Sequence, residues 1–494
     1  MFIQKHCLYF AFALLATTAL ASESDTRLAN AARKHDLPAI RALLDQKADV
    51  NGRSSDGSTA LLWLSHASDA EAVSLLLRAG ANPNLANDYR ATPLSEACIN
   101  RNPELVRTLL ESDANPNQPI ATGETPLMTC ARAGDARTVQ LLLKRDAAIN
   151  AKETNQGQTA LMWAAAERHP DVVKELIAAH ADLTLRSKQG FTALHFAARV
   201  GDLDSVKGLL DAGMDINILT QTADREAART AGGFTPLLVA TLRAQVDVAL
   251  YLLERGADPN VDAAGMMPLH WAATTWEGFA ANPVYGFEDA MSGIPDRQAK
   301  LRLVKALLAH GAKVNARMTK RQPSFATGYT EAVGATPFLL AASVDDVEMM
   351  HLLLDAGADP KIATETKAST LMAATGLNHG IGESLVTEAD ALAAVKLLLD
   401  LGVDPKGETT FGENALFGPA YRGWNTLLAQ MIDLGVNVNA VSKAGVTPWL
   451  AANGQGDRLG GVLYNKAGAD LLAKHGADPK LGSPCEAQNK CREK

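Results

Sequence analysis

The stretch GFTALHFAARVGDLDSVKGLLDAGMDIN occupies residues 190–217. It decides the fold of this chain because it contains one complete packing unit. Thr192 is placed to cap a short helix, since a threonine hydroxyl accepts from the free N–H groups of a first helical turn. Gly201 separates this helix from a second one, which ends at Gly213, a residue suited to the left-handed position after a helix. The second helix carries one apolar stripe at i, i+3 and i+4, formed by Val206, Leu209 and Leu210.

A single helix pair cannot bury both of its apolar faces, so it needs a similar neighbour on each side. Copies of the unit recur along the chain and end on related exit residues: Asn51, Asn84, Asn117, Asn150, Thr184, Asn217, Asn260, Asn315, Lys361, Lys406, Asn439 and Lys480. Six of the eleven steps between these residues are 33 or 34 residues long. The spacing predicts about twelve helix-turn-helix repeats stacked into an all-α solenoid with one continuous core.

Several copies carry closely similar motifs: ATPLSEAC at 91–98, ETPLMTCARAGD at 124–135, QTALMWAAA at 158–166, GADPN at 256–260 and MPLHWAA at 267–273. With the period of 33, these motifs resemble the ankyrin-repeat family from about Asp25 to Lys480. The resemblance implies antiparallel helix pairs, hairpin fingers between repeats, and a concave face that typically binds another protein. It implies no enzymatic activity.

The charge balance argues against a nucleic-acid surface, because the 494-residue chain has 47 Lys and Arg against 55 Asp and Glu. Aromatic residues make up only 5% of the chain, so a local cluster of them is informative.

The first 21 residues have the pattern of a secretory signal peptide. Lys5 and His6 precede an apolar run that ends in Ala19-Leu20-Ala21, a small-x-small cleavage pattern. The alternative is a membrane anchor, but the apolar run is shorter than the roughly 20 residues that a spanning helix needs. We therefore expect a periplasmic or extracellular protein with no membrane span after cleavage.

The repeats divide into a regular part, 25–217, and an embellished part, 218–480, followed by a tail at 481–494. Counting from each exit residue to the next Thr position places 10 and 13 extra residues in the fingers of repeats seven and nine. Additions of 23, 12 and 8 residues fall between the two helices of repeats eight, ten and twelve. Insertions of this kind commonly carry the function of a repeat scaffold.

The longest insertion, residues 274–297, concentrates four aromatic residues in an aromatic-poor chain: Trp276, Phe279, Tyr285 and Phe287. Exposed aromatic clusters are normal anchors for a protein partner. The alternative is that the loop folds back and buries them as a small core of its own.

The finger of repeat nine, residues 316–334, combines basic and aromatic side chains: Arg317, Lys320, Arg321, Phe325 and Tyr329. Such a set suits an acidic or carboxylate-bearing partner. The alternative is a solvated loop without a binding role.

The histidines and tryptophans of the repeats occupy recurring slots, which indicates structural roles. Trp63, Trp163 and Trp271 all lie four residues after the Thr position, so we expect packing residues. His195 and His270 occupy the family's Thr-Pro-Leu-His position, which the resemblance assigns to hydrogen bonding within the stack. No hydrolase, phosphate-loop, dinucleotide or metalloprotease motif occurs in its required context, so we expect no catalytic residue, metal or cofactor.

Four cysteines follow the signal peptide. Cys98 and Cys130 belong to adjacent repeats, roughly 8 to 10 Å apart, which is too far for an undistorted disulfide, so we expect small core thiols. Cys485 and Cys491 lie in the tail, and the oxidising destination favours a local disulfide between them.

Together these patterns favour a monomeric, non-enzymatic scaffold that binds a protein through the concave face and insertions of repeats seven to ten. Two alternatives stay open. One is an enzyme or small-ligand site built by the 274–297 insertion, and the other is a structural component of the cell envelope.

Overall fold

The computed structural model describes residues 25–221, 232–275, 294, 296–320, 332–377, 386–455 and 464–482. Regular secondary structure in these ranges is helical, with one isolated bridge between Arg53 and Thr59. The contacts divide the chain into two compact units, one ending at Ala121 and the other beginning at Thr122. Each unit is a stack of helix pairs, as the sequence predicts.

The described part of the first unit contains three helix pairs, α1(Arg27–Arg33) with α2(Leu37–Asp45), α3(Ala60–His66) with α4(Ala70–Arg78), and α5(Pro93–Ile99) with α6(Pro103–Glu111). The described ranges of the second unit contain nine pairs: α7(Pro126–Ala133) with α8(Ala136–Leu143), α9(Ala160–Ala166) with α10(Pro170–Ala178), α11(Ala193–Val200) with α12(Leu203–Asp211), α14(Pro236–Leu242) with α15(Val246–Glu254), α16(Pro268–Ala272) with α17(Arg297–Ala309), α18(Pro337–Ser343) with α19(Val347–Asp355), α20(Thr370–Ala374) with α21(Glu388–Asp400), α22(Phe417–Arg422) with α23(Asn425–Asp433), and α24(Pro448–Ala452) with α25(Lys466–Lys474).

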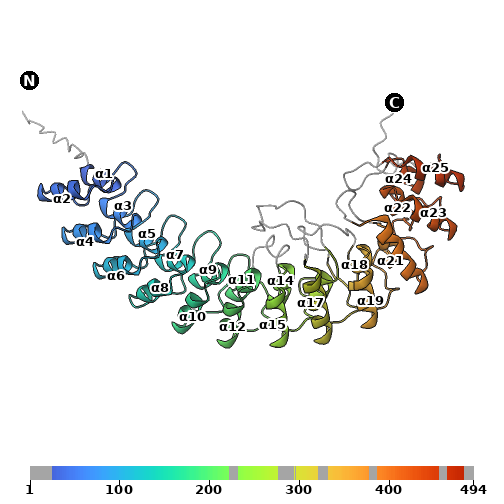
Figure 1. Ribbon diagram of the computed structural model, residues 1–494, viewed down its shortest axis with the longest axis horizontal. Helices are drawn as coiled ribbons and strands as arrows, with labels where there is room; N and C mark the ends of the chain where they lie inside the picture. Colours follow the sequence, from blue (N-terminus) through green and yellow to red (C-terminus); the bar gives the residue numbers. More distant parts are fainter. Residues whose placement is uncertain are drawn as a thin grey trace, which may run out of the picture. The chain divides into compact units, whose positions relative to one another are not determined.

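Within each unit, neighbouring pairs stack in register. Helix α9 packs between α7 and α11, and α10 packs between α8 and α12. Figure 1 shows the result in the second unit, where first helices follow one another in one row and second helices in another. The shared stripes are buried between pairs; Val206 and Leu209 of α12, for example, are fully buried.

The first helices begin as the repeats predict. Thr235 caps α14, because its Oγ1 accepts from Leu238 N at 3.1 Å, and Pro236 takes the first helical position. In residues 190–217 the cap works through a neighbour: His195 Nδ1 lies 2.9 Å from Thr192 Oγ1 and accepts from Thr192 N at 3.3 Å. Its Nε2 reaches Phe234 O of the next repeat at 3.0 Å. His270 bonds likewise to Met267 N and Ala316 O, so the stacking role of both histidines is confirmed.

The exit residues form a ladder that continues through the long repeats. Asn217 Oδ1 accepts from Asp258 N at 2.9 Å, Asn260 Oδ1 from Lys313 N at 2.8 Å, and Asn315 Oδ1 from Asp359 N at 2.8 Å. The same bond joins Asn51 to Asn82 N in the first unit. The insertions of repeats seven, eight and nine therefore leave the joint to the next repeat unchanged.

The finger bases show where the extra length lies. In repeat six, Ser187 N donates to Phe191 O across four residues. The corresponding bonds run from Thr220 N to Phe234 O and from Met318 N to Ala335 O, which are 14 and 17 residues apart. The excess of 10 and 13 residues matches the sequence prediction, and both fingers close in the regular way.

The other additions fall between the helices of a pair, also as predicted. Residues 273–296 separate α16 from α17, and residues 375–387 separate α20 from α21. Both second helices extend to 13 residues instead of the usual nine. Thr387 and Asp390 form a capping box at the start of α21.

The cysteine prediction was wrong in one respect. Cys98 of α5 and Cys130 of α7 are buried, as expected of core residues, but both are disulfide-bonded rather than free thiols. The prediction used only the average spacing between repeats. Whether two sulfur atoms can pair depends also on the directions of the two cysteine side chains. Cys485 and Cys491 lie outside the described residues, so their pairing stays a prediction.

The first repeat exposes Arg27, Arg33, Lys34 and Asp36, a polar surface of the kind that ends a repeat array. The tryptophan positions were expected to be packing slots. Trp271 is fully buried, and Trp63 and Trp163 are partly so. Across the described ranges, no helix combines the length and the apolar character that crossing a membrane requires.

A candidate binding pocket at the base of the longest insertion

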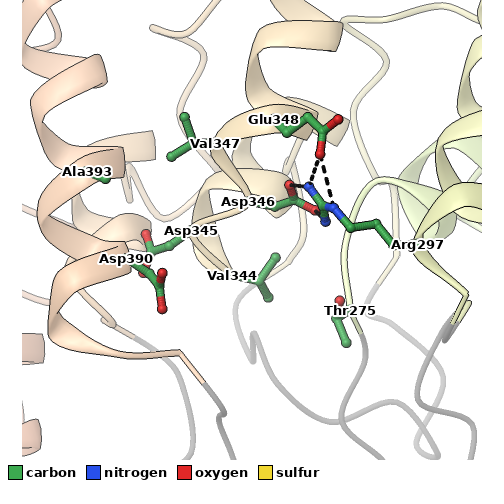
Figure 2. A pocket seen from close by; sticks show the side chains of 9 residues that line it. All are labelled: Thr275, Arg297, Val344, Asp345, Asp346, Val347, Glu348, Asp390 and Ala393. Atoms are coloured by element: carbon green, nitrogen blue, oxygen red, sulfur yellow. Dashed lines mark hydrogen bonds and ion pairs between the residues drawn. The ribbon is translucent and has the colours of Figure 1, made fainter.

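A pocket of about 500 Å³ lies where the longest insertion joins the helical stack. Thr275 at one end of the insertion and Arg297 at the other both line it. The rest of its wall comes from the turn between α18 and α19 and from the first turns of α21, as Figure 2 shows. These residues are Val344, Asp345, Asp346, Val347, Glu348, Asp390 and Ala393.

The α18–α19 turn carries two consecutive aspartates with different backbone roles. Asp345 has a positive φ of 52°, the left-handed conformation that follows most of the first helices. Gly134 and Gly201 fill the same slot in other repeats, with φ of 85° and 74°. Asp346 caps α19, because its Oδ1 accepts from Met349 N at 3.0 Å. The repeat backbone thus presents two carboxyl groups side by side at one corner of the pocket.

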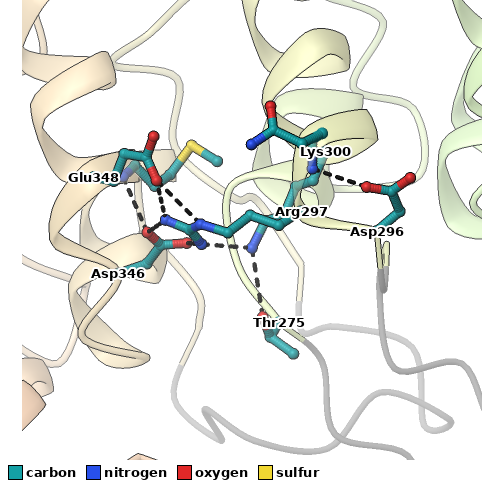
Figure 3. A network of polar contacts seen from close by, with 8 residues as sticks. Thr275, Asp296, Arg297, Lys300, Asp346 and Glu348 are labelled. Atoms are coloured by element: carbon teal, nitrogen blue, oxygen red, sulfur yellow. Dashed lines mark hydrogen bonds and ion pairs between the residues drawn. The ribbon is translucent and has the colours of Figure 1, made fainter.

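One of the two carboxyl groups is neutralised by Arg297, the first residue of α17. Its guanidinium donates to both oxygens of Asp346, at 2.9 and 3.1 Å, and twice to Glu348 Oε2, at 2.6 and 3.0 Å (Figure 3). These bonds raise the pKa of Arg297. Burial raises the pKa of the Asp346 carboxyl, but the bonds from Arg297 and Met349 N outweigh it, so the net pKa is lowered.

Lys300, one helical turn further along α17, supports the same corner from inside. Only 4% of its side chain is exposed, and its Nζ lies 3.6 Å from Asp346 Oδ2 and 3.4 Å from Thr275 Oγ1. Burial lowers the pKa of its ammonium, although Asp346 opposes the shift. Lys300 and Arg297 together compensate the charges of Asp346 and Glu348.

Asp345 differs from its neighbour. It is 7% exposed, and its Oδ1 is buried without a hydrogen-bond partner in the described part of the chain. Burial raises the pKa of its carboxyl well above the usual value, Arg422 opposes the shift, and Asp390 adds to it. A buried polar atom without a partner is uncommon in folded proteins and calls for an explanation.

Asp390 completes the acidic side of the pocket. Its Oδ2 accepts from Thr387 N at 3.1 Å and from Thr387 Oγ1 at 2.6 Å, while its side chain stays exposed. Figure 2 shows its carboxyl beside that of Asp345, on the side of the pocket away from Arg297. The pocket therefore has one side where charges are paired and one where two carboxyl groups face each other.

A second hollow of about 450 Å³ lies on the other side of α17. Ile294 and Asp296 from the end of the insertion line it, together with residues of α15 and of the turn before it. Two of its four charged residues, Arg302 and Asp247, are paired at 2.8 Å and exposed, and none of its lining residues has a buried side-chain atom without a partner. This hollow thus lacks the unpartnered group that distinguishes the first.

The described ranges contain no group of three or more His, Cys, Asp or Glu that could hold a metal ion. His195 and His270 are fully buried, and burial lowers the pKa of each to about 4. Both bond within the stack, so neither is available to a ligand.

Two of the residues predicted to bind a partner lie in the described part of the ninth finger. Arg317 Nη2 donates to Ala363 O at 3.1 Å, and Lys320 Nζ donates to Ala263 O at 2.7 Å. Equivalent bonds recur elsewhere: Lys152 Nζ donates to Arg186 O one repeat later. The two cations therefore tie their finger to its neighbours, although both side chains remain exposed.

The other predicted partner-binding residues lie outside the described residues: Trp276, Phe279, Tyr285, Phe287, Arg321, Phe325 and Tyr329. Asp345 was not among the residues predicted from the sequence to form a site. A signal for it exists, because the slot that ends a first helix holds Gly in repeats four and six and Asp in repeat nine. The residue type at this position does not show that the carboxyl group lacks a hydrogen-bond partner.

Comparison with known protein families agrees with this architecture. Family models described as ankyrin repeats match residues 28–120, 114–187, 179–263 and 333–365. No curated protein shows a significant match. Among solved structures, the human ASB11 ankyrin repeat domain is similar, with 24% identity and a TM-score of 0.41, covering 47% of this chain and 98% of that one.

Proposed function

Because the chain belongs to the ankyrin-repeat family, whose repeats are generally protein-interaction modules, we propose that it is a non-enzymatic scaffold. Its partner docks on the concave face and the insertions of repeats seven to ten. The observation that carries this proposal is the exit ladder of repeats seven to nine, in which Asn217, Asn260 and Asn315 bond across the long repeats as in regular ones. Since stacking does not depend on the added residues, they are free to serve recognition.

Within the ninth finger, the contacts of the basic residues support a structural role for them. Arg317 and Lys320 already donate to backbone carbonyls of neighbouring fingers, so they position the finger. Recognition then falls mainly to the aromatic residues, which supply large contact area at small entropic cost. These are Trp276, Phe279, Tyr285 and Phe287 of the long insertion, with Phe325 and Tyr329 of the finger.

The test is partner capture by crosslinking in the native compartment, followed by mass spectrometry. We expect the double variant Trp276→Ala, Phe279→Ala to lose at least tenfold of the captured partner while the helical circular dichroism stays unchanged. The matched control is Tyr89→Ala, which removes an aromatic side chain 72% exposed on a regular finger. Capture that survives the double variant, or that depends only on Tyr89, would overturn the assignment to repeats seven to ten.

We also propose a periplasmic or extracellular location. The support is the signal-peptide pattern of residues 1–21 and the disulfide-bonded state of Cys98 and Cys130, which is typical of oxidising compartments. Amino-terminal sequencing of the native protein should begin at Ser22, and alkylation of the unfolded chain without a reductant should leave Cys98 and Cys130 unmodified, since both are buried in the folded protein. A chain that retains Met1, or an alkylated Cys98, would contradict the proposal.

A further inference from the structure

We propose that the pocket between α17, α19 and α21 receives one basic side chain of the partner, a guanidinium or an ammonium, between Asp345 and Asp390. This inference rests on the proposed scaffold function and names the chemistry of one contact. Two observations support it. A buried carboxyl oxygen has no hydrogen-bond partner in the described structure, and the carboxyl groups around the pocket outnumber the nearby cations.

The charges leave room for one more cation. Four carboxyl groups line the pocket, those of Asp345, Asp346, Glu348 and Asp390. Three cations lie near these groups. Arg297 bonds Asp346 and Glu348, and Lys300 pairs with Asp346. Arg422 acts on Asp345 through its charge but gives its Oδ1 no hydrogen bond, so one carboxyl group remains in excess. Asp345 and Asp390 are left facing each other, an arrangement that a cation between them would stabilise.

The unpartnered oxygen indicates a hydrogen-bond donor. Asp345 Oδ1 is buried and has no partner in the described structure, so its desolvation is uncompensated. Asp390 uses Oδ2 for its capping box and keeps Oδ1 for another donor. A guanidinium carries five N–H donors and an ammonium three, enough to bond both carboxyl groups at once.

The pocket also fits the remainder of a long basic side chain. Its volume of about 500 Å³ exceeds what a water molecule needs, and Val344, Val347 and Ala393 provide apolar wall. The methylene stem of Lys or Arg packs well on such a wall while the charged head binds further in.

Two other ligand classes fit less well. An anion would have to compete for Arg297, whose guanidinium already makes four bonds. A metal ion needs a larger set of converging ligands than the described residues around Asp345 provide.

The first measurement is calorimetric titration of the full chain with N-acetyl-arginine N-methylamide, with its neutral citrulline counterpart as the ligand control. We expect millimolar binding of the arginine probe and at least tenfold weaker binding of the citrulline probe. Asp345→Asn and Asp390→Asn should each weaken the arginine probe at least tenfold. Asparagine keeps the shape and tolerates the left-handed backbone, so Asp345→Asn should fold. Equal binding of both probes, or binding indifferent to both variants, would overturn the proposal.

The matched protein control is Asp355→Asn, which removes the same charge from an exposed position at the end of α19. It should bind the arginine probe as the parent chain does; an equal loss would show a general field effect and overturn the pocket.

The second measurement is partner capture with Asp345→Asn, which should fall at least tenfold if the cation belongs to the partner. Loss of probe binding with unchanged capture would assign the pocket to a free small cation and overturn the inference. That outcome leaves the scaffold function standing, because the Trp276→Ala, Phe279→Ala variant tests that function separately.

Discussion

Repeat six, residues 190–217, and repeat nine, residues 336–361, share a backbone plan but treat buried polar groups differently. In repeat six, His195 is fully buried and hydrogen-bonded through both ring nitrogens, to Thr192 and Phe234. In repeat nine, Asp345 is nearly as buried, and its Oδ1 has no partner within the described ranges. The histidine is explained by the stack alone, whereas the aspartate is not.

This difference distinguishes residues that stabilise the scaffold from residues of a candidate binding site. A buried polar group whose bonds are all made within the repeat array stabilises the array and needs no ligand. A buried carboxyl without a donor destabilises the fold, so its presence is better explained by a binding role. The contributions of His195 and Asp345 to the free energy of unfolding also change with pH in opposite directions, so denaturation experiments can measure the difference.

Acidification should produce the largest effect. The pKa of His195 and of His270 is lowered to about 4 by burial, against an ordinary 6.5. Their neutral forms thus contribute stability above pH 6.5 that is lost as the pH falls to about 4, about 3 kcal/mol for each histidine. Urea denaturation between pH 7.5 and 4.5 should show this fall in the free energy of unfolding. His195→Gln should reduce the slope by about half; an unchanged slope would show that other groups cause it.

Asp345→Asn should act in the opposite direction and more weakly. Because the folded pKa of Asp345 is raised, its ionised form destabilises the fold at neutral pH, and this penalty disappears as the pH falls below about 3.8. The variant should therefore be about 1 to 3 kcal/mol more stable than the parent at pH 7, with a gap that closes in acid. Thermal and urea denaturation check this. A variant less stable than the parent at pH 7 would mean that the carboxylate has a partner in the free protein.

Gly201→Asp transfers the residue of repeat nine into the corresponding slot of repeat six. Gly201 has φ of 74°, and a Cβ there would lie 2.1 Å from the end of the flexible Gln245 side chain. We expect a loss of about 1 to 2 kcal/mol in urea denaturation, because an L residue is strained in this conformation and the amide must move aside. No second arginine-probe site should appear in calorimetry. Two sites in the variant would show that the slot alone makes the pocket.

The smallest effect should come from an exposed pair of repeat six. Asp204 and Lys207 lie 3.1 Å apart on α12, with 73% and 42% of their side chains exposed. Asp204→Asn should change the free energy of unfolding by about 0.5 kcal/mol or less, because solvent screens such pairs. This variant shows how much an ordinary exposed substitution changes the free energy of unfolding. A change above about 1 kcal/mol would contradict the predicted order of effects.

The sequence predicted the scaffold in detail. The Thr and Pro positions placed the starts of first helices such as α14, and the exit residues placed the joints between repeats. Even the 10 and 13 extra finger residues follow from counting, because the repeat fixes where each finger must close. Local hydrogen-bond rules repeated at a fixed period determine these features, so no long-range information is needed.

Residue roles at the embellished repeats could not be predicted as well. The partner binding of Arg317 and Lys320 stays a prediction, but the sequence did not indicate that their donors also reach Ala363 O and Ala263 O in fingers about one repeat away. Cys98 and Cys130 suggested free thiols, yet they are disulfide-bonded. In each case the outcome depends on which atoms a side chain reaches across repeats, which a one-repeat pattern does not contain.

The sequence alone thus determined the family, the helix pairs, the register and the positions of the insertions. Only the tertiary structure decided that Arg297 neutralises Asp346 and Glu348 from another repeat while Asp345 keeps an oxygen without a donor. The physical reason is range: caps, turns and apolar stripes are satisfied within a few residues along the chain. The charge state of a buried carboxyl is set instead by side chains that stacking brings within a few ångströms from 40 to 80 residues away.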